Sequence, residues 1–238
     1  RITGVPEPGN PLAGAVGTWA GASPMTFQPQ WPRCSGGDYP SAVSAAAPSA
    51  YWRLGETSGT TAVDATGAGN GLTYQSGVAL GRDGAIAGDA NHAIALDGAD
   101  DSLIRNPFTG FASGAFTAEM FVKTTDATRN GGLLSYAVPG SANEVLVSGA
   151  GNLRVSVNGT LVTTGIAVAD GAWHHLAVSW RSSDGALRLY KDGGLAFSGT
   201  VAAGRSIGSG GSVVLGQDQD GVGGGFDPSQ ALLGRLDE

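Results

Sequence analysis

Five oxygen-bearing side chains lie close together near the end of the chain, between residues 218 and 230. They are Asp218, Gln219, Asp220, Asp227 and Gln230. Calcium is a hard cation that takes six to eight oxygen ligands, at about 2.3–2.6 Å, from carboxylates, amide oxygens and backbone carbonyls. This stretch offers all three kinds of oxygen. It therefore predicts a calcium site.

A strand and a glycine-rich turn would position these ligands. Ser212–Gln217 is predicted to be a strand, and alternation beyond it would direct Asp218 and Asp220 to one face. The backbone carbonyl of Gln219 would lie between them. Glycines are frequent from 221 to 225, and they let the loop fold back because glycine adopts positive φ at low cost. The returning chain would carry the last two ligands toward the same ion.

An EF-hand explains this stretch poorly. If Asp218 were the first loop position, the fifth and twelfth would be Val222 and Ser229, where that motif needs Asp or Asn and then Glu. The flanking sequence also predicts no helices. The expected site is therefore a calcium loop at the end of a strand.

Composition limits the other classes of function. The chain has 238 residues, with 20 acidic and 13 basic side chains and a net charge of -7, so we expect no nucleic-acid partner. The single cysteine, Cys34, excludes an intrachain disulfide and an all-cysteine zinc site. The apolar runs of the chain are far shorter than the ~18–20 residues of a membrane span, so no membrane insertion is expected. The chain begins at Arg1 without a signal-peptide pattern, and we expect a processed or excerpted piece.

Short alternating segments separated by turns dominate from Ala50 onward. Ala115–Lys123 alternates with a period of two, and Asn158-Gly159 between two alternating runs is a strong hairpin signal. About a dozen strands at 8–12-residue spacing predict an all-β sandwich of two antiparallel sheets. The strands expected are Tyr51–Leu54, His92–Asp97, Ala115–Lys123, Asn152–Asn158, Thr160–Thr164, Ala172–Arg181, Ala186–Lys191, Gly194–Ser198, Ser212–Gln217 and Ala231–Leu236.

Several strings in this order resemble one known family of modules. They are YWRLGE (51–56), FTAEMFVK (116–123), DGAWHHLAVSW (170–180) and LYKDG (189–193). They resemble laminin-G-like, concanavalin A-like jelly-roll modules of bacterial surface proteins. Val213–Glu238 closely resembles the calcium-site segment of pentraxins, a branch of that superfamily. The resemblance implies a concanavalin A-like jelly roll over 50–238 whose last strand is truncated, which would leave an unpaired edge strand.

The N-terminal part has a resemblance of its own. Residues 17–37 look like the middle of an immunoglobulin-like repeat common in bacterial adhesins. A complete sandwich of that kind needs about 80–100 residues. We therefore expect a partial immunoglobulin-like segment over 1–44, folded incompletely or packed loosely, then a linker over 45–49 and the jelly roll over 50–238.

The pentraxin resemblance adds one ligand from a distant part of the chain. Pentraxins use an Asp-Asn pair on a strand-edge loop, and here Asn143 matches the Asn while Ala142 replaces the Asp. Pentraxins often hold two calcium ions, and the lost carboxylate should weaken at least one of these sites. One calcium ion is therefore expected here, and the second site would lack one of its ligands. The expected ligand set is Asn143, Asp218, Gln219, Asp220, Asp227 and Gln230.

Catalysis is not expected. Glycoside hydrolases of this jelly-roll class need two carboxyls about 5–5.5 Å apart in a retaining enzyme, and no Glu-x-Asp-x-x-Glu string occurs. Asp100 and Asp101 are adjacent, so a strand would point them apart, and Asp97–Asp101 indicates a turn. His174 and His175 would point to opposite faces of a strand and could not chelate one ion together.

The function expected is non-catalytic, calcium-assisted binding of a glycan or protein by a secreted or cell-surface module. The resemblance implies that the ion could coordinate an anionic or hydroxyl group of the ligand directly. Two alternatives stay open: a spacer domain of an adhesin in which calcium only stiffens a loop, and an accessory module of an extracellular glycoside hydrolase. The ligand and the oligomeric state are not determined by the sequence.

Overall fold

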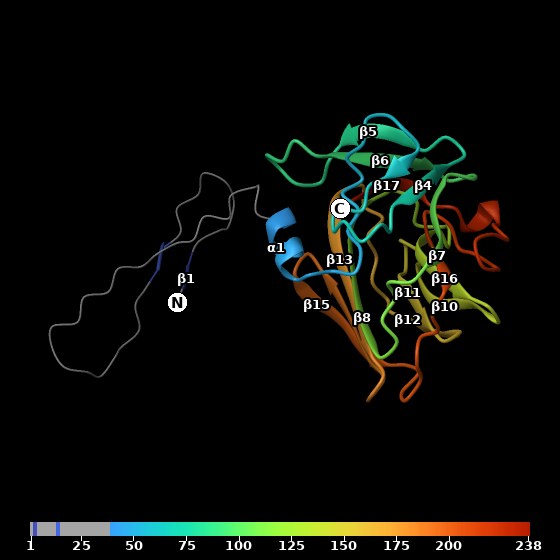
Figure 1. The fold of residues 1–238 in the computed structure, drawn as a ribbon. Coiled ribbons are helices and arrows are strands. Elements are labelled where there is room, and N and C mark those ends of the chain that lie inside the picture. Colours follow the sequence, from blue (N-terminus) through green and yellow to red (C-terminus); the bar gives the residue numbers. More distant parts are fainter. Residues whose placement is uncertain (1, 4–12, 15–38) are drawn as a thin grey trace, which may run out of the picture.

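A computed structural model describes residues 2–3, 13–14 and 39–238. Residues 50–238 form two antiparallel sheets that pack face to face (Figure 1), which confirms the expected all-β jelly roll. The elements are β1 (Ile2–Thr3), β2 (Ala13–Gly14), α1 (Tyr39–Ala45), β3 (Thr61–Ala62), β4 (Leu72–Gln75), β5 (Ala79–Asp83), β6 (His92–Asp97), β7 (Ser102–Phe108), β8 (Ala115–Lys123), β9 (Gly132–Val138), β10 (Ser141–Ser148), β11 (Arg154–Val157), β12 (Thr160–Thr163), β13 (Trp173–Arg181), β14 (Ala186–Lys191), β15 (Gly194–Thr200), β16 (Gly211–Leu215), the 3₁₀ turn η1 (Pro228–Gln230) and β17 (Leu233–Asp237).

The order of the strands determines which loops can meet. One sheet has the order β12-β11-β10-β9-β16-β7-β4-β3, and the other has the order β15-β14-β13-β8-β17-β6-β5. The apolar faces of both sheets form one core, in which Trp180 is 2% exposed. Trp173 and Tyr190 are only half-buried, because alternation turns them to the outer face of their sheet.

The predicted alternation of β8 is confirmed. β8 pairs with β13 along its full length. Met120 and Val122 are buried in the core, while Thr117 and Glu119 are exposed. A period of two on a half-buried strand thus gave both the bounds and the orientation of this element.

The two adjacent histidines of β13 do lie on opposite faces. The buried His174 places its Nδ1 2.7 Å from Asp192 and its Nε2 3.0 Å from Asp170. His175 is half-buried on the other face and packs against Phe121, with ring centroids 4.9 Å apart. His174 therefore contacts two carboxylates and His175 contacts an aromatic ring, so the two imidazoles do not converge on one ligand.

A tight hairpin turn forms at Asn158-Gly159, where the sequence predicted one, and a second forms at Asp192-Gly193. Asn158 and Gly159 have φ of 48° and 71°, and Asp192 and Gly193 have φ of 52° and 77°. Two consecutive residues of positive φ define the tight turn whose twist matches that of antiparallel strands. The first turn joins β11 to β12, and the second joins β14 to β15.

Two expectations for the start of the module are wrong. Tyr51–Leu54 is not a strand: Trp52 forms a single bridge with Asp64, and Leu54 takes a left-handed φ of 54°. No helix was predicted from the sequence, yet Tyr39–Ala45 forms α1. Most of the immunoglobulin-like segment expected over 1–44 lies outside the described residues.

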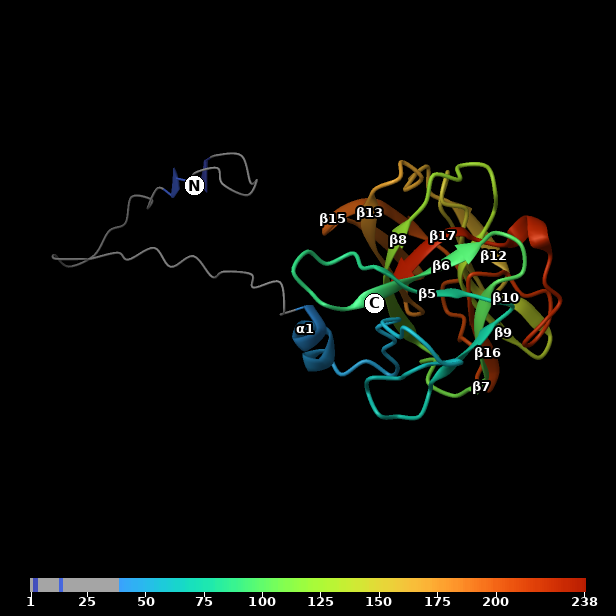
Figure 2. The same ribbon diagram turned by 90° about the horizontal axis from the view of Figure 1, so that it is seen from above.

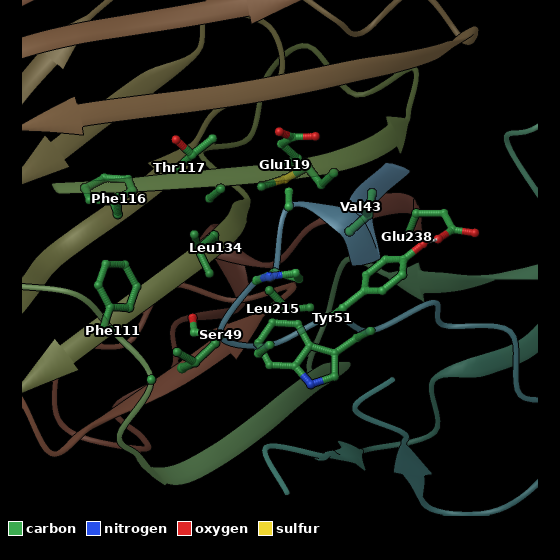
Figure 3. A pocket seen from close by; sticks show the side chains of 18 of the residues that line it. Val43, Ser49, Tyr51, Phe111, Phe116, Thr117, Glu119, Leu134, Leu215 and Glu238 are labelled. Carbon is green, nitrogen blue, oxygen red and sulfur yellow. Dashed lines mark hydrogen bonds between the residues drawn. The ribbon is translucent and has the colours of Figure 1, made fainter. Parts of the chain in front are cut away.

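One stretch of β8 has no partner strand on its β17 side within residues 39–238. β17 pairs with β8 only opposite Phe121, Val122 and Lys123. Beside the unpaired part lies a mainly apolar cavity of about 710 Å³, bordered by α1. Phe111 and Phe116 lie at one end of it and Tyr51 and Glu238 at the other (Figure 3). That stretch of β8 is therefore an open sheet edge among residues 39–238.

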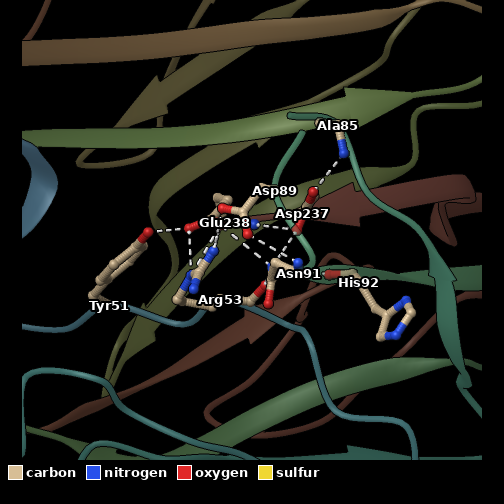
Figure 4. Close-up of polar contacts among 8 residues, drawn as sticks. All are labelled: Tyr51, Arg53, Ala85, Asp89, Asn91, His92, Asp237 and Glu238. Atoms are coloured by element: carbon tan, nitrogen blue, oxygen red, sulfur yellow. Dashed lines mark hydrogen bonds and ion pairs between the residues drawn. The ribbon is translucent and has the colours of Figure 1, made fainter. Parts of the chain in front are cut away.

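A buried polar cluster holds the end of β17 against the start of the module (Figure 4). The Glu238 side chain is fully buried and accepts hydrogen bonds from Arg53, whose Nη2 is 2.7 Å from Oε1, and from the hydroxyl of Tyr51. The same Nη2 lies 2.7 Å from Asp89 in the loop between β5 and β6. One guanidinium therefore joins three segments that are distant in the sequence.

Asp237 makes stability depend on pH. Burial raises the pKa of Asp237 to about 6. A hydrogen bond of 2.6 Å from the Ala85 N–H acts in the opposite direction and lowers this pKa. The folded state therefore binds a proton between about pH 4 and 6 that the unfolded state releases, so this group lowers stability as the pH rises through that window. We expect Asp237→Asn to remove about 1–2 kcal/mol of that decline, measured as urea unfolding at several pH values. An unchanged profile would contradict the assignment.

None of the helices in the described residues is long and apolar enough to cross a membrane.

Candidate metal centre

The loop from Gln217 to Gln230 leaves the end of β16 and folds back over the outer face of the eight-stranded sheet. Gln219 anchors it, with no exposed surface. Its amide nitrogen donates to the carbonyls of Ser135 on β9 and Ser212 on β16, both at 2.9 Å. Its amide oxygen accepts from the N–H of Gly223 at 2.9 Å and from the Ser212 hydroxyl. All the hydrogen-bonding capacity of this amide is used within the fold, so only the Gln219 backbone carbonyl could serve an ion.

A glycine beneath the loop permits this close approach. A Cβ atom at Gly132 would lie 2.4 Å from the carbonyl carbon of Gln217 and 2.6 Å from the nitrogen of Asp218. Because both contacts are with backbone, no rotamer change could relieve them. The loop thus covers the outer face of β9, and every residue of that strand is buried.

Asp218 is a buried carboxylate that lacks a cation among the described residues. It is 5% exposed, and its Oδ1 has no hydrogen-bond partner. Burial, followed by the charge of Asp220, raises the pKa of Asp218 to about 6, whereas the Gln219 N–H and the more distant Arg154 act in the opposite direction. A divalent cation would relieve both causes of that shift.

Gln230 reaches Asp218 from the far end of the loop. Its amide nitrogen lies 3.3 Å from Asp218 Oδ2, and its amide oxygen is buried without a partner. Asp227 caps the intervening turn η1 through an Oδ1 that accepts from the Ser229 N–H at 2.8 Å, and this lowers the pKa of Asp227. The cap fixes the turn that brings Gln230 back to Asp218.

The remaining loop carboxylates lie at the surface. Asp220 and Asp227 are exposed. Within residues 39–238, the carboxylate oxygens of Asp218, Asp220 and Asp227 do not all come within 4.8 Å of one another. The fold therefore joins Asp218 and Gln230 directly and keeps Asp220 near enough to shift a pKa, while Asp227 is committed to its cap.

Asn143 lies in β10 and not in the strand-edge loop that the resemblance implied. It occupies the irregular stretch between Ser141 and Val145, where the register with β9 shifts. Its backbone carbonyl accepts from the N–H of Gly159 at 2.9 Å, while its side-chain Oδ1 is buried without a partner. No hydrogen bond in the described part of the chain joins Asn143 to the loop.

Unpaired buried oxygens test whether these residues suit a cation. Buried polar atoms almost always have a hydrogen-bond partner, so each exception indicates a missing ligand or water. Within residues 39–238, seven buried side-chain atoms lack one, and three of them are Asn143 Oδ1, Asp218 Oδ1 and Gln230 Oε1. All three are oxygens of residues in the expected ligand set, which fits a hard cation.

A two-sheet jelly roll that carries an oxygen-rich loop across one outer face fits a pentraxin-like module. The family model described as "Pentaxin family" matches residues 113–238, which is more than half of the chain. The protein belongs to the pentraxin family.

The relatives are much longer than the part they share with this chain. Neuronal pentraxin-1 of Rattus norvegicus is 40% identical over 125 residues, which cover 51% of this chain and 29% of the relative. A Rattus norvegicus protein with sushi, von Willebrand factor type A, EGF and pentraxin domains is 39% identical over 127 residues, 52% of this chain and 4% of that protein. The matched region therefore spans less than a third of these relatives.

Solved structures support the same fold. The heptameric SAP-like pentraxin of Limulus polyphemus has a TM-score of 0.52 and 26% identity, over 61% of this chain and 73% of its own. Domain 4 of AbnA, an extracellular arabinanase of Geobacillus stearothermophilus, was solved with arabinotriose. It has a TM-score of 0.52 and 20% identity, over 73% of this chain and 84% of its own, and this second likeness shows the fold alone.

Proposed function

We propose that this protein is a non-catalytic binding module that uses calcium, held by the loop from Asp218 to Gln230, to bind a glycan or protein ligand outside the cell. The three unpaired buried oxygens at Asn143, Asp218 and Gln230 carry this proposal. Membership of the pentraxin family supports a binding role rather than an enzymatic one.

The buried and the exposed members of the set would have different roles. Asp218, Gln230 and Asn143 would hold the ion from within the fold, since their free oxygens have lost contact with water. Asp220 would complete the coordination from the surface, where it is exposed. Because calcium accepts up to eight oxygens, positions open to solvent could take a hydroxyl or an anionic group of the ligand.

Calcium titration of the wild type and Asp220→Ala tests the ion. Asp220 is exposed, so its truncation should leave the fold intact. Extracellular modules bind calcium at about 0.1–1 mM, and the loss of one charged ligand should weaken this binding at least about tenfold. Isothermal titration measures the difference, with Asp83→Asn on the exposed edge of β5 as the control. Equal heats for the wild type and Asp220→Ala would remove the ligand role.

A glycan array, read with calcium and with a chelator, then separates binding from a spacer role. Ligand binding that requires calcium and is lost in Asp220→Ala supports the module proposed here. Calcium that stabilises the protein while no glycan or protein ligand depends on it would favour the spacer domain of an adhesin.

A further inference from the structure

We propose that the turn between β6 and β7 binds a second calcium-class cation through Asp97, Asp100 and Asp101, with the amide oxygen of Gln217 as a further ligand. This site is separate from the Asp218–Gln230 loop. The sequence indicated only a turn here, and it assigned no ion to these residues.

The three carboxylates converge in the folded turn. One oxygen from each of Asp97, Asp100 and Asp101 lies within 4.8 Å of the other two. Oxygens on opposite sides of a calcium ion are about 4.8 Å apart when each bond is about 2.4 Å, so the three oxygens fit around one ion. Within residues 39–238 this is the one group of three acidic, histidine or cysteine side chains that meets that distance.

A buried amide beside the turn supplies an independent observation. Gln217 is 1% exposed, and its nitrogen donates to the carbonyl of Ala99 in the turn at 3.2 Å, which places the amide group there. Its Oε1 is buried and has no partner. A flip of the amide would set that oxygen against the Ala99 carbonyl, so the orientation that leaves Oε1 free is the favoured one.

A cleft adjoins Gln217 and one carboxylate of the turn. Gln217, Asp100 and Ser102 line the same hollow of about 380 Å³, together with Phe226 and Pro228 of the Asp218–Gln230 loop. The hydroxyl of Ser102, in a residue 1% exposed, is a second buried oxygen without a partner. Two residues with unpaired buried oxygens and one carboxylate residue of the turn thus lie around the same hollow.

The charges of the turn are not balanced by the fold. The Arg129 guanidinium donates to the carbonyl of Gly98 in this turn, but its charge is paired with Asp126 at 3.1 Å. Asp101 is 4% exposed, and its Oδ2 accepts only from the Asp97 N–H, at 3.0 Å. Burial and the two neighbouring carboxylates raise the pKa of Asp101. A divalent cation would offset this repulsion.

Calcium titration of matched variants tests the site by stoichiometry. We expect the wild type to bind two ions, Asp101→Asn to lose one, and Asp218→Asn to lose the other. Asparagine at 101 can still accept from the Asp97 N–H, so the turn should persist. Asp100→Asn, at an exposed position, should weaken the same ion at least about tenfold. If Asp101→Asn does not fold, the Asp100→Asn variant alone tests whether the turn binds an ion.

The outcomes are distinct from those for the loop. An Asp100→Asn protein that binds as many ions as the wild type, with the same affinities, overturns the second site, whatever Asp218→Asn does. A single ion that Asp218→Asn removes and Asp100→Asn leaves unchanged also overturns it, while supporting the loop. Asp83→Asn, a carboxylate outside both groups, should change neither ion.

Discussion

Replacing Asp218 with asparagine should raise the melting temperature of the calcium-free protein and abolish the further rise that calcium gives the wild type. The carboxylate is 5% exposed, lies near Asp220 and has an oxygen without a partner, so its charge is costly when no cation is present. Asparagine keeps the shape and removes the charge. We expect a gain of about 1–2 kcal/mol without calcium, which is roughly 2–8 °C for a domain of this size.

With calcium present, Asp218→Asn should lose stabilisation instead of gaining it. At a tenfold excess over Kd, an ion stabilises the folded state by about 1.4 kcal/mol, so the wild type should melt a few degrees higher in calcium than in chelator. In Asp218→Asn the two melting curves should coincide, apart from any contribution of the β6–β7 turn, which Asp100→Asn removes. A variant that melts below the wild type in chelator, or that keeps the full calcium shift, would contradict the buried-ligand role.

Replacing Arg53 with alanine should destabilise the protein more than the loss of a surface arginine. Arg53 is the cation that the fully buried Glu238 side chain faces, at 2.7 Å, and its removal leaves that charge beside Asp237. Breaking a buried ion pair by removing one partner costs about 3–5 kcal/mol, and the 32% exposure of the Arg53 side chain favours the lower end. Chemical unfolding at pH 7 measures this loss.

Two further variants give this test its controls. Arg181 forms an ion pair of 2.6 Å with Asp184, but both side chains are exposed, so Arg181→Ala should destabilise the protein far less than Arg53→Ala. Adding Glu238→Gln to Arg53→Ala should restore part of the loss, because the unpaired charge is then gone. If Arg53→Ala unfolds no more easily than Arg181→Ala, the buried cluster does not hold the end of β17.

Strands with one buried face and one solvent-exposed face could be predicted from the sequence. β8 alternates because one side meets the core and the other meets solvent, and its bounds were correct. The Asn158-Gly159 turn followed from the steric freedom of those residues at positive φ. In both cases the signal is local, so the sequence alone carries it.

The strands next to the metal loop were not predictable by the same rule. Every residue of β9 is buried, because the loop that follows β16 covers its outer face. The strand therefore shows a run of apolar and small residues rather than alternation, and the covering segment lies more than 80 positions further along the chain. The start of the module failed for a related reason: Tyr51 and Arg53 point to Glu238, near the other end of the sequence.

The candidate ligands divide in the same way. The loop between Asp218 and Gln230 was found because its oxygens are close in sequence, and Asn143 was found only through the family resemblance. Gln217 and Asp101 could not be linked beforehand, because nothing local shows that an amide at the end of β16 lies beside the turn after β6. A search for buried oxygens without partners detects such pairs once the fold is known.

The helix α1 and the loop from Asp218 to Gln230 lie on opposite sides of the sandwich in both views (Figures 1 and 2). The chain enters the sandwich through α1, while the red turn η1 marks the loop at the remote side. Tyr39, the first residue of α1, therefore lies on the side of the sandwich away from that loop. A large ligand that approached the proposed metal loop would therefore meet the side of the module that is remote from α1.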